Sequence, residues 1–149
     1  MALTAKMVNI GHKKATSRIA VACGDIILKK ETLRAIKERN IKKGDVFTVS
    51  QIAGIQAIKN TWNILSLCHQ IPLHSISIDF ISKKDRITSV CTVITDYKTG
   101  VEMEALLGVS IALLSIWDMV KYIEKDNKGQ YPKTSITNIR ILKKISDRK

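Results

Sequence analysis

Aromatic residues are scarce in this sequence: phenylalanine, tryptophan and tyrosine together make up 5% of its 149 residues. Proteins that bind single-stranded nucleic acid use aromatic side chains as platforms on which successive bases stack. A chain with so few aromatic residues is therefore a poor match to that class of protein.

Cysteines are also few, and their spacing argues against a disulfide framework. The chain has 3 of them, Cys23, Cys68 and Cys91, and no two form a CxxC pair. An odd number of widely spaced thiols is more typical of a reducing compartment than of a secreted domain.

A secretion signal and a membrane anchor are not indicated by any segment. Residues 1–9 lack a long apolar stretch, as a signal peptide would need. The longest apolar run, residues 106–120, is short for a bilayer span and contains Asp118. We therefore expect a cytoplasmic protein.

Acidic residues are outnumbered: 13 Asp and Glu stand against 25 Lys and Arg, which gives a formal net charge of +12. This balance favours an anionic partner, such as nucleic acid, an anionic membrane or a phosphorylated metabolite. The lysines are nevertheless spread along the chain, as on an ordinary solvated surface. Hydrophobic residues account for 45% of the chain, enough for one domain, 1–149, with a packed core.

Hydrophobic periodicity predicts the order of helices and strands after a polar, poorly ordered lead-in over residues 1–15. The expected strands cover residues 19–23, 75–80, 86–97 and 135–145, the first of them ending at Gly24 and Asp25. The expected helices cover residues 31–39, about 45–63 with Asp45 as N-cap, and 101–125. This order predicts an α+β fold, a ferredoxin-like sandwich with an antiparallel sheet and helices packed on one face.

Asp118 and Lys121 are the first candidates for chemistry, because they lie three residues apart on one helix face. One interpretation is a routine ion pair at the edge of the core. The other is a carboxylate in a functional site, because Asp118 follows a strongly apolar segment. The sequence leaves both open.

Glu102 and Glu104 lie in the first turn of the same helix, where acidic side chains interact favourably with the helix dipole. Glu104 and Asp118 share a face of that helix but are separated by about 21 Å at 1.5 Å per residue. If both act on one ligand, the ligand is long or the pocket is built from two subunits.

Cys68 and His69, with His74 nearby, could suggest a metal site, but structural zinc needs four ligands at recognisable spacing. We therefore expect no metal. A histidine satisfied in the core and a histidine that contacts a substrate from a loop both remain possible, and the loop position favours the second. Lys43 precedes Gly44 and a helix N-terminus, which suits an anion such as phosphate but also describes an ordinary turn.

Five blocks of sequence carry a resemblance to a known family. They read Lys43-Gly44-Asp45-Val46-Phe47, Ile52-Ala53-Gly54-Ile55-Gln56-Ala57, Leu67-Cys68-His69, Thr99-Gly100-Val101-Glu102-Met103-Glu104-Ala105-Leu106 and Asp118-Met119-Val120-Lys121. In this order and spacing, the chain resembles the cyclic pyranopterin monophosphate synthase family (molybdenum cofactor biosynthesis protein C). The resemblance extends from Met7 to Lys144, and the tail from Lys144 to Lys149 departs from the family pattern.

The resemblance implies a lyase that converts 3',8-cyclo-7,8-dihydroguanosine 5'-triphosphate to cyclic pyranopterin monophosphate and pyrophosphate. It implies a single catalytic domain that assembles as a hexamer, a trimer of dimers with active sites at the dimer interfaces. In such a dimer, we expect the Lys43–His69 region of one subunit to lie over the Asp118 end of its neighbour. Asp118, Lys43 and Lys121 match the catalytic residues of the family. The residues that match or neighbour its substrate contacts are Leu67, Cys68, His69, Met103, Glu104, Glu102, Arg18 and Lys144.

The chemistry of these residues suits such a substrate. Lys43, Arg18 and Lys144 would bind the triphosphate. Asp118 and Lys121 would move protons during ring opening and closure, while His69 and Glu104 would hold the ring. We expect no organic cofactor, and a need for Mg²⁺ is left open.

A non-catalytic nucleic-acid-binding α+β module is the alternative that the positive charge supports. It does not explain Glu102, Glu104 and Asp118, which would repel a phosphate backbone. It would also be expected to carry paired aromatic residues on its sheet. A purely structural subunit explains none of the blocks.

Overall fold

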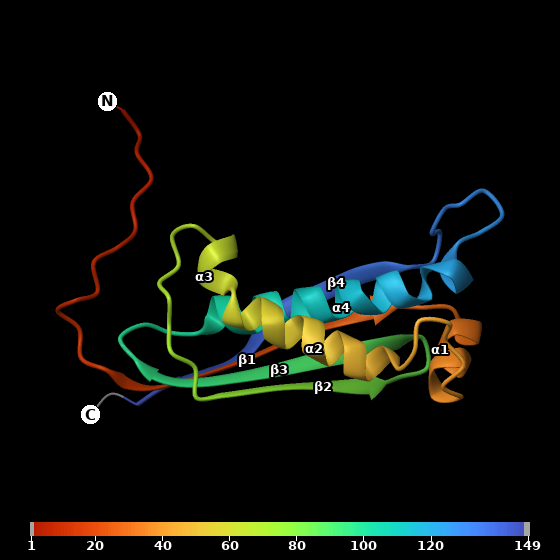
Figure 1. The fold of residues 1–149 in the computed structure, drawn as a ribbon, viewed down its shortest axis with the longest axis horizontal. Coiled ribbons are helices and arrows are strands. Elements are labelled where there is room, and N and C mark those ends of the chain that lie inside the picture. The colour runs from red at the N-terminus through yellow and green to blue at the C-terminus, as the bar shows by residue number, and fades with distance from the viewer. Residues whose placement is uncertain (1, 148–149) are drawn as a thin grey trace.

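The computed structural model describes residues 2–147 as one sheet with helices packed on one of its faces (Figure 1). The strands are β1 (Thr16–Ile27), β2 (Ser75–Ser82), β3 (Arg86–Tyr97) and β4 (Ser135–Ser146). The helices are α1 (Lys30–Lys37), α2 (Val46–Lys59), α3 (Thr61–Ile64) and α4 (Glu102–Glu124).

The four strands are arranged in the order β2-β3-β1-β4, and every neighbouring pair is antiparallel. With α1 to α3 taken as one helical connection, the chain follows the β–α–β–β–α–β pattern of ferredoxin-like folds. The predicted α+β fold with helices on one face of an antiparallel sheet is confirmed.

Helix α4 is the central element of the core. Its buried side chains, among them Val109, Leu113 and Ile116, pack against the sheet. The helix is long and apolar enough to cross a membrane by length and composition, but half of its most apolar window is buried within the protein. The apolar run that looked too short for a membrane span is thus part of a 23-residue helix that packs in the core.

Glycines permit the close crossing of α2 and α4. A Cβ atom at Gly54 would lie 3.0 Å from the carbonyl oxygen of Gly108 and still closer to Ile78. A Cβ atom at Gly108 would in turn meet the side chain of Ile58. The two helices can therefore approach each other only because neither position carries a side chain.

The prediction of a short first strand was wrong, because β1 continues through Gly24 and Asp25 to Ile27. Gly24 is not a strand breaker here. A Cβ atom at this position would lie 2.9 Å from Val109 Cγ1 and 3.0 Å from Leu113 Cδ1, so glycine lets α4 approach the sheet. The pairing of β1 with β4 shifts register between Cys23 and Asp25.

The N-cap of α2 is confirmed, since Asp45 Oδ1 accepts a 2.9 Å hydrogen bond from the backbone amide of Thr48. This helix ends at Lys59 rather than near residue 63, and the short α3 follows it. The predicted strands that became β2, β3 and β4, and the helix that became α4, lie within one or two residues of their predicted limits.

The predicted lead-in is more closely attached to the domain than the sequence suggested. Residues 2–15 contain no helix or strand, and most of them are exposed. Ile10, however, is buried, and Lys98 Nζ donates a 3.1 Å hydrogen bond to the carbonyl of Gly11. The part of this segment nearest β1 is therefore anchored to the domain.

Candidate active site

The predicted site residues fall into two clusters at opposite ends of α4. Asp118 and Lys121 lie near its C-terminal end, whereas Glu102, Met103 and Glu104 lie in its first turn. The rise of an α-helix puts about 21 Å between Glu104 and Asp118. We call the first group the Asp118 cluster and the second, with the loop residues beside it, the Glu104 cluster.

The Asp118 cluster consists of a carboxylate between two lysines. Lys43 Nζ lies 2.9 Å from Asp118 Oδ2 and 3.2 Å from the Asp118 carbonyl oxygen. Lys121 Nζ lies 2.9 Å from Asp118 Oδ1. Hydrogen bonds from Lys43 and then from Lys121 lower the pKa of the Asp118 carboxyl below its usual range.

The exposure of this group bears on the two interpretations of Asp118. Its side chain is 56% exposed, so it is not a carboxylate at a buried core margin. Exposed ion pairs contribute only about 0–1 kcal/mol to stability. Two lysines around one exposed carboxylate are thus poorly explained by stability and suit a site for an anionic ligand.

The structure also corrects one expected grouping. Lys43 was expected to lie with His69 and to reach Asp118 only across a subunit interface, but Lys43 lies in the Asp118 cluster of the same chain. Arg18 and Lys144 lie on the adjacent strands β1 and β4, at the end of the molecule where α4 begins. Lys144 pairs there with Glu102. The sequence could not reveal this division because it depends on how the loop before α2 meets α4.

The Glu104 cluster surrounds a cavity of about 440 Å³. Its walls come from the loop before β2, the start of α4 and the N-terminal segment. The predicted residues that line it are Leu67, Cys68, His69, Glu102, Met103 and Glu104. The N-terminal segment adds Lys6, Val8, Ile10 and Lys13, which sequence reasoning did not single out.

Glu104 is the least exposed polar group of this cavity, with 4% of its surface accessible. Burial raises the pKa of its carboxyl, and the nearby charge of Glu102 adds to the effect. Burial likewise raises the pKa of the Cys68 thiol, with Glu104 as the second cause. The cavity therefore contains groups that keep their protons more readily than usual, as functional sites often do.

Glu102 contacts the basic residues of this end. Its Oε1 lies 2.9 Å from Lys144 Nζ. Burial opposes ionisation of Glu102, but Lys144 and the charge of Arg18 outweigh it and lower the pKa of this carboxyl. The dipole interaction predicted for Glu102 and Glu104 thus does not describe either residue fully, since one is paired and the other buried. In the divergent tail, residues 148–149 lie outside the described part of the chain.

His69 contacts the N-terminal segment, since its Nε2 lies 2.7 Å from the carbonyl oxygen of Val8. The ring is half-buried at the rim of the cavity. His69 is therefore not a core histidine. Within residues 2–147, His, Cys, Asp and Glu side chains form no group of three that could hold a metal ion.

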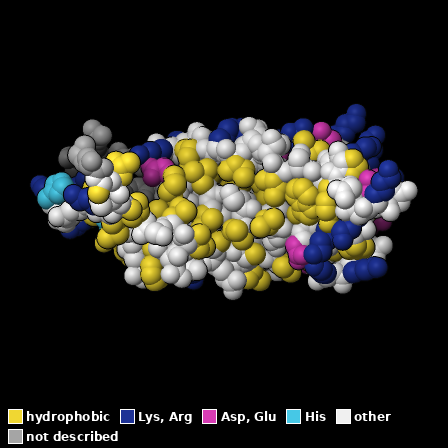
Figure 2. All heavy atoms as spheres, turned by 90° about the horizontal axis from the view of Figure 1, so that it is seen from above, with side chains coloured by type: hydrophobic (Ala, Val, Ile, Leu, Met, Phe, Trp, Pro, Cys, Tyr) yellow, Lys and Arg dark blue, Asp and Glu magenta, His cyan; other side chains and the backbone are white. Residues whose placement is uncertain are grey.

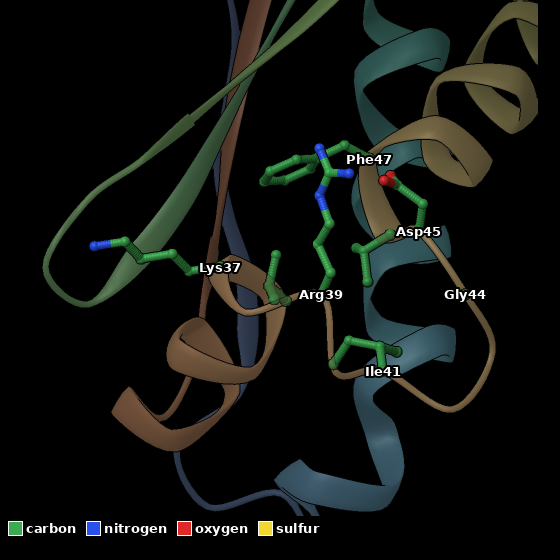
Figure 3. A pocket seen from close by; sticks show the side chains of 8 residues that line it. Lys37, Arg39, Ile41, Gly44, Asp45 and Phe47 are labelled. Carbon is green, nitrogen blue, oxygen red and sulfur yellow. The ribbon is translucent and has the colours of Figure 1, made fainter.

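The loop that carries Lys43 is held close to the C-terminal turns of α4, as Figure 3 shows from the side of a small neighbouring cavity. Sequence reasoning missed Tyr122, whose hydroxyl accepts a hydrogen bond from the backbone of this loop. Its position four residues after Asp118, on the same helix face, was the only signal that could have found it.

Residues 7–146 match the sequence model of the MoaC family. The chain belongs to the MoaC family.

Named relatives support this membership over nearly the whole chain. A protein of Pyrococcus furiosus, called "Probable cyclic pyranopterin monophosphate synthase", is 56% identical over 95% of this chain and 91% of its own length. One of Thermoplasma acidophilum with the same name is 47% identical over 93% of this chain and 96% of its own length. One of Methanothermobacter thermautotrophicus, 52% identical over 93% of this chain and 87% of its own length, is called "Probable cyclic pyranopterin monophosphate synthase accessory protein".

Proposed function

We propose that this MoaC family protein is a cyclic pyranopterin monophosphate synthase of molybdenum cofactor biosynthesis, a lyase that acts as a single catalytic domain. It converts 3',8-cyclo-7,8-dihydroguanosine 5'-triphosphate to cyclic pyranopterin monophosphate and pyrophosphate. The observation that carries this proposal is the exposed Lys43–Asp118–Lys121 group, with both lysines 2.9 Å from the carboxylate.

In this reaction the Asp118 cluster moves protons and stabilises charge. Asp118 and Lys121 exchange protons with nitrogen and oxygen atoms of the ring as it opens and closes. Lys43 stabilises negative charge beside them. A low carboxyl pKa leaves Asp118 ionised at neutral pH, the form that a general base needs, although it also makes the carboxylate a weaker base.

The Glu104 cluster binds the substrate. Arg18 and Lys144 supply positive charge for the triphosphate, with Glu102 holding Lys144 in place. Leu67, Cys68, His69, Met103 and Glu104 contact the ring system. Glu104, in its protonated form, would donate a hydrogen bond to a ring acceptor.

The separation of the two clusters supports a pocket shared between two subunits. A pocket for one nucleotide cannot span about 21 Å of helix within one chain. A symmetric dimer would bring the Asp118 cluster of one copy to the Glu104 cluster of the other and form two identical pockets. The hexamer, a trimer of dimers, is part of this proposal.

Exposed apolar surface is available for such an assembly. Figure 2 shows hydrophobic side chains along the length of one face, with many of the lysines and arginines toward one end. Exposed large hydrophobic residues occur on several elements, among them Val49, Ile52, Leu114, Ile139 and Leu142. Contiguous apolar surface of this kind is typical of protein interfaces.

The proposed enzyme uses no organic cofactor and no structural metal, with any Mg²⁺ arriving with the triphosphate. It works in the cytoplasm, because its few and widely spaced cysteines fit a reducing compartment. The alternative of a nucleic-acid-binding module rests on the net charge of +12, but the carboxylates in both clusters oppose it.

Incubation of the protein with the cyclised nucleotide tests the proposal. We expect release of pyrophosphate together with a product that oxidises to a fluorescent pterin. Binding to an oligonucleotide should be weak and should decrease steeply with salt, as expected for phosphate contacts alone. Salt-resistant micromolar binding to the oligonucleotide, without pyrophosphate release, would contradict the proposed enzymatic function.

A further inference from the structure

The loop before α2 that carries Lys43 has an irregular backbone. Arg39 has a positive φ of 55° and Gly44 one of 111°, so the chain changes direction at both ends of the segment. Within the loop, the Gly44 amide donates a 3.0 Å hydrogen bond to the Ile41 carbonyl, and the Ile41 side chain is buried. The residues between, Lys42 and Lys43, are exposed.

Two neighbouring residues of this loop contact α4 at two points. Lys43 Nζ lies 2.9 Å from Asp118 Oδ2. The Lys42 backbone amide donates a 3.1 Å hydrogen bond to the Tyr122 hydroxyl. Asp118 and Tyr122 are four residues apart, so they stand about one turn from each other on the same face of α4.

The Tyr122 ring makes a second contact with the loop. Lys42 Nζ lies over it, 4.9 Å from the ring centroid, which is a favourable cation–π distance. Tyr122 is 38% exposed and lies outside the group of side chains that forms the core. The hydroxyl and the ring of Tyr122 therefore contact the loop, and the side chain is not part of the packed core.

We propose that Tyr122 is a positioning residue for Lys43: it fixes the Lys42 backbone against α4, so that the Lys43 ammonium stays beside the Asp118 carboxylate. A lysine side chain is long and flexible and does not define its own position. The irregular loop gives it little help, because no helix or strand supports residues 40–45. The Tyr122 hydroxyl adds a fixed point on α4 to the anchor that the buried Ile41 side chain provides.

This inference rests on the proposed function only for its effect on turnover. Tyr122→Phe removes the hydroxyl and keeps the ring. We expect kcat to fall about tenfold with little change in KM, because a misplaced charge-stabilising group affects the transition state more than substrate binding. The thermal unfolding temperature should stay unchanged.

The control for a merely structural effect is the same substitution in Lys43→Ala protein. If Tyr122 acts through Lys43, Tyr122→Phe causes no further loss of activity in Lys43→Ala protein, because the lysine that Tyr122 positions is already absent. An equal loss in both backgrounds, or an unchanged kcat in an active protein, overturns the proposal.

A second readout does not depend on activity. Titration of the Asp118 side-chain carboxyl carbon by NMR reports the contact with Lys43 directly. In Tyr122→Phe the pKa of the Asp118 carboxyl should rise toward its value in Lys43→Ala protein. Lys121 still pairs with Asp118 in both variants. A wild-type protein that releases no pyrophosphate contradicts the proposed function alone, whereas an unchanged titration in Tyr122→Phe overturns the role of Tyr122.

Discussion

Asp118 is an exposed carboxylate between two lysines. Exposed ion pairs contribute little to the free energy of unfolding, so we expect the same of this group. Removing any of the three side chains should therefore leave the fold intact. We expect Asp118→Asn, Lys43→Ala and Lys121→Ala each to reduce turnover by about a hundredfold or more, the usual scale for a positioned acid–base or charge-stabilising group.

Steady-state kinetics with circular dichroism checks this prediction. Lys125→Ala is the matched control, because Lys125 is an exposed lysine at the end of the same helix whose side chain makes none of the described ion pairs. A loss of activity as large in Lys125→Ala as in Lys121→Ala would mean that general surface charge, not the Asp118 cluster, is responsible.

Glu104 should make stability depend on pH. Burial raises the pKa of its carboxyl above the ordinary value of 4.5, so the folded protein holds this proton more tightly than the unfolded chain does. Stability then decreases as pH rises from the unfolded pKa through the folded one, and the cost is fully present above both. Glu104→Gln should unfold at a higher temperature than wild type near pH 7, and this advantage should disappear near pH 4.

Thermal unfolding at the two pH values measures this difference. Glu38→Gln serves as the control, because Glu38 is exposed and its substitution replaces a surface carboxyl rather than a buried one. If Glu104→Gln is no more stable than wild type at neutral pH, the buried carboxylate is stabilised by a partner other than the residues described.

Cys68 should be dispensable for the chemistry. Burial raises the pKa of its thiol, so little of the reactive thiolate is present at neutral pH. Cys68→Ser should cost less than about tenfold in kcat/KM, as expected for a contact residue. Activity as low as that of Asp118→Asn would require a covalent step or a metal at this thiol.

The sequence identified the individual residues of both clusters but not how they divide. Lys43 and Asp118 are 75 positions apart, and only the tertiary contact of the loop with α4 shows that they form one group. The N-terminal Lys6 and Val8 were missed for the same reason, since nothing in their local pattern indicates the distant cavity that they line. The only signal for Tyr122 was its position four residues after Asp118, which does not show its contact with the loop.

Among the elements, the crossing of α2 and α4 places the most stringent limits on residue size. Gly54→Ala would put a methyl group 3.0 Å from the Gly108 carbonyl oxygen. The cost of overpacking, about 1–3 kcal/mol, should exceed the gain in helix propensity of about 1 kcal/mol. We expect a net decrease in the free energy of unfolding, measured by urea denaturation.

Gln56→Ala on the exposed face of α2 is the control for this measurement, and its effect should stay within about 0.5 kcal/mol. A Gly54→Ala protein as stable as wild type would show that the two helices can separate slightly at no cost. In that case the close crossing is not required for the fold.

Most elements were predictable because their hydrophobic periods are regular. The alternation over β2 and the long apolar pattern of α4 gave limits close to those observed. The first strand was predicted too short because glycine is usually a breaker. Gly24 has a different role here, since the packing of Val109 and Leu113 above it requires the absence of a side chain.

At the scale of the whole molecule, the two clusters lie too far apart to serve one nucleotide within one chain. We therefore propose that each pocket joins the Asp118 cluster of one subunit to the Glu104 cluster of another. The family resemblance predicted sites at dimer interfaces, but the sequence alone could not show that Lys43 belongs with Asp118 rather than with His69.

Complementation between inactive variants tests this claim most directly. Asp118→Asn and His69→Ala carry one lesion in each cluster, and they are mixed in equal amounts after dissociation and then reassembled. In a mixed dimer one pocket inherits both lesions and the other neither, so activity should return to at most about a quarter of wild type for random pairing. Mixed dimers that are verified by mass spectrometry and remain inactive would show that each pocket takes both residues from one chain.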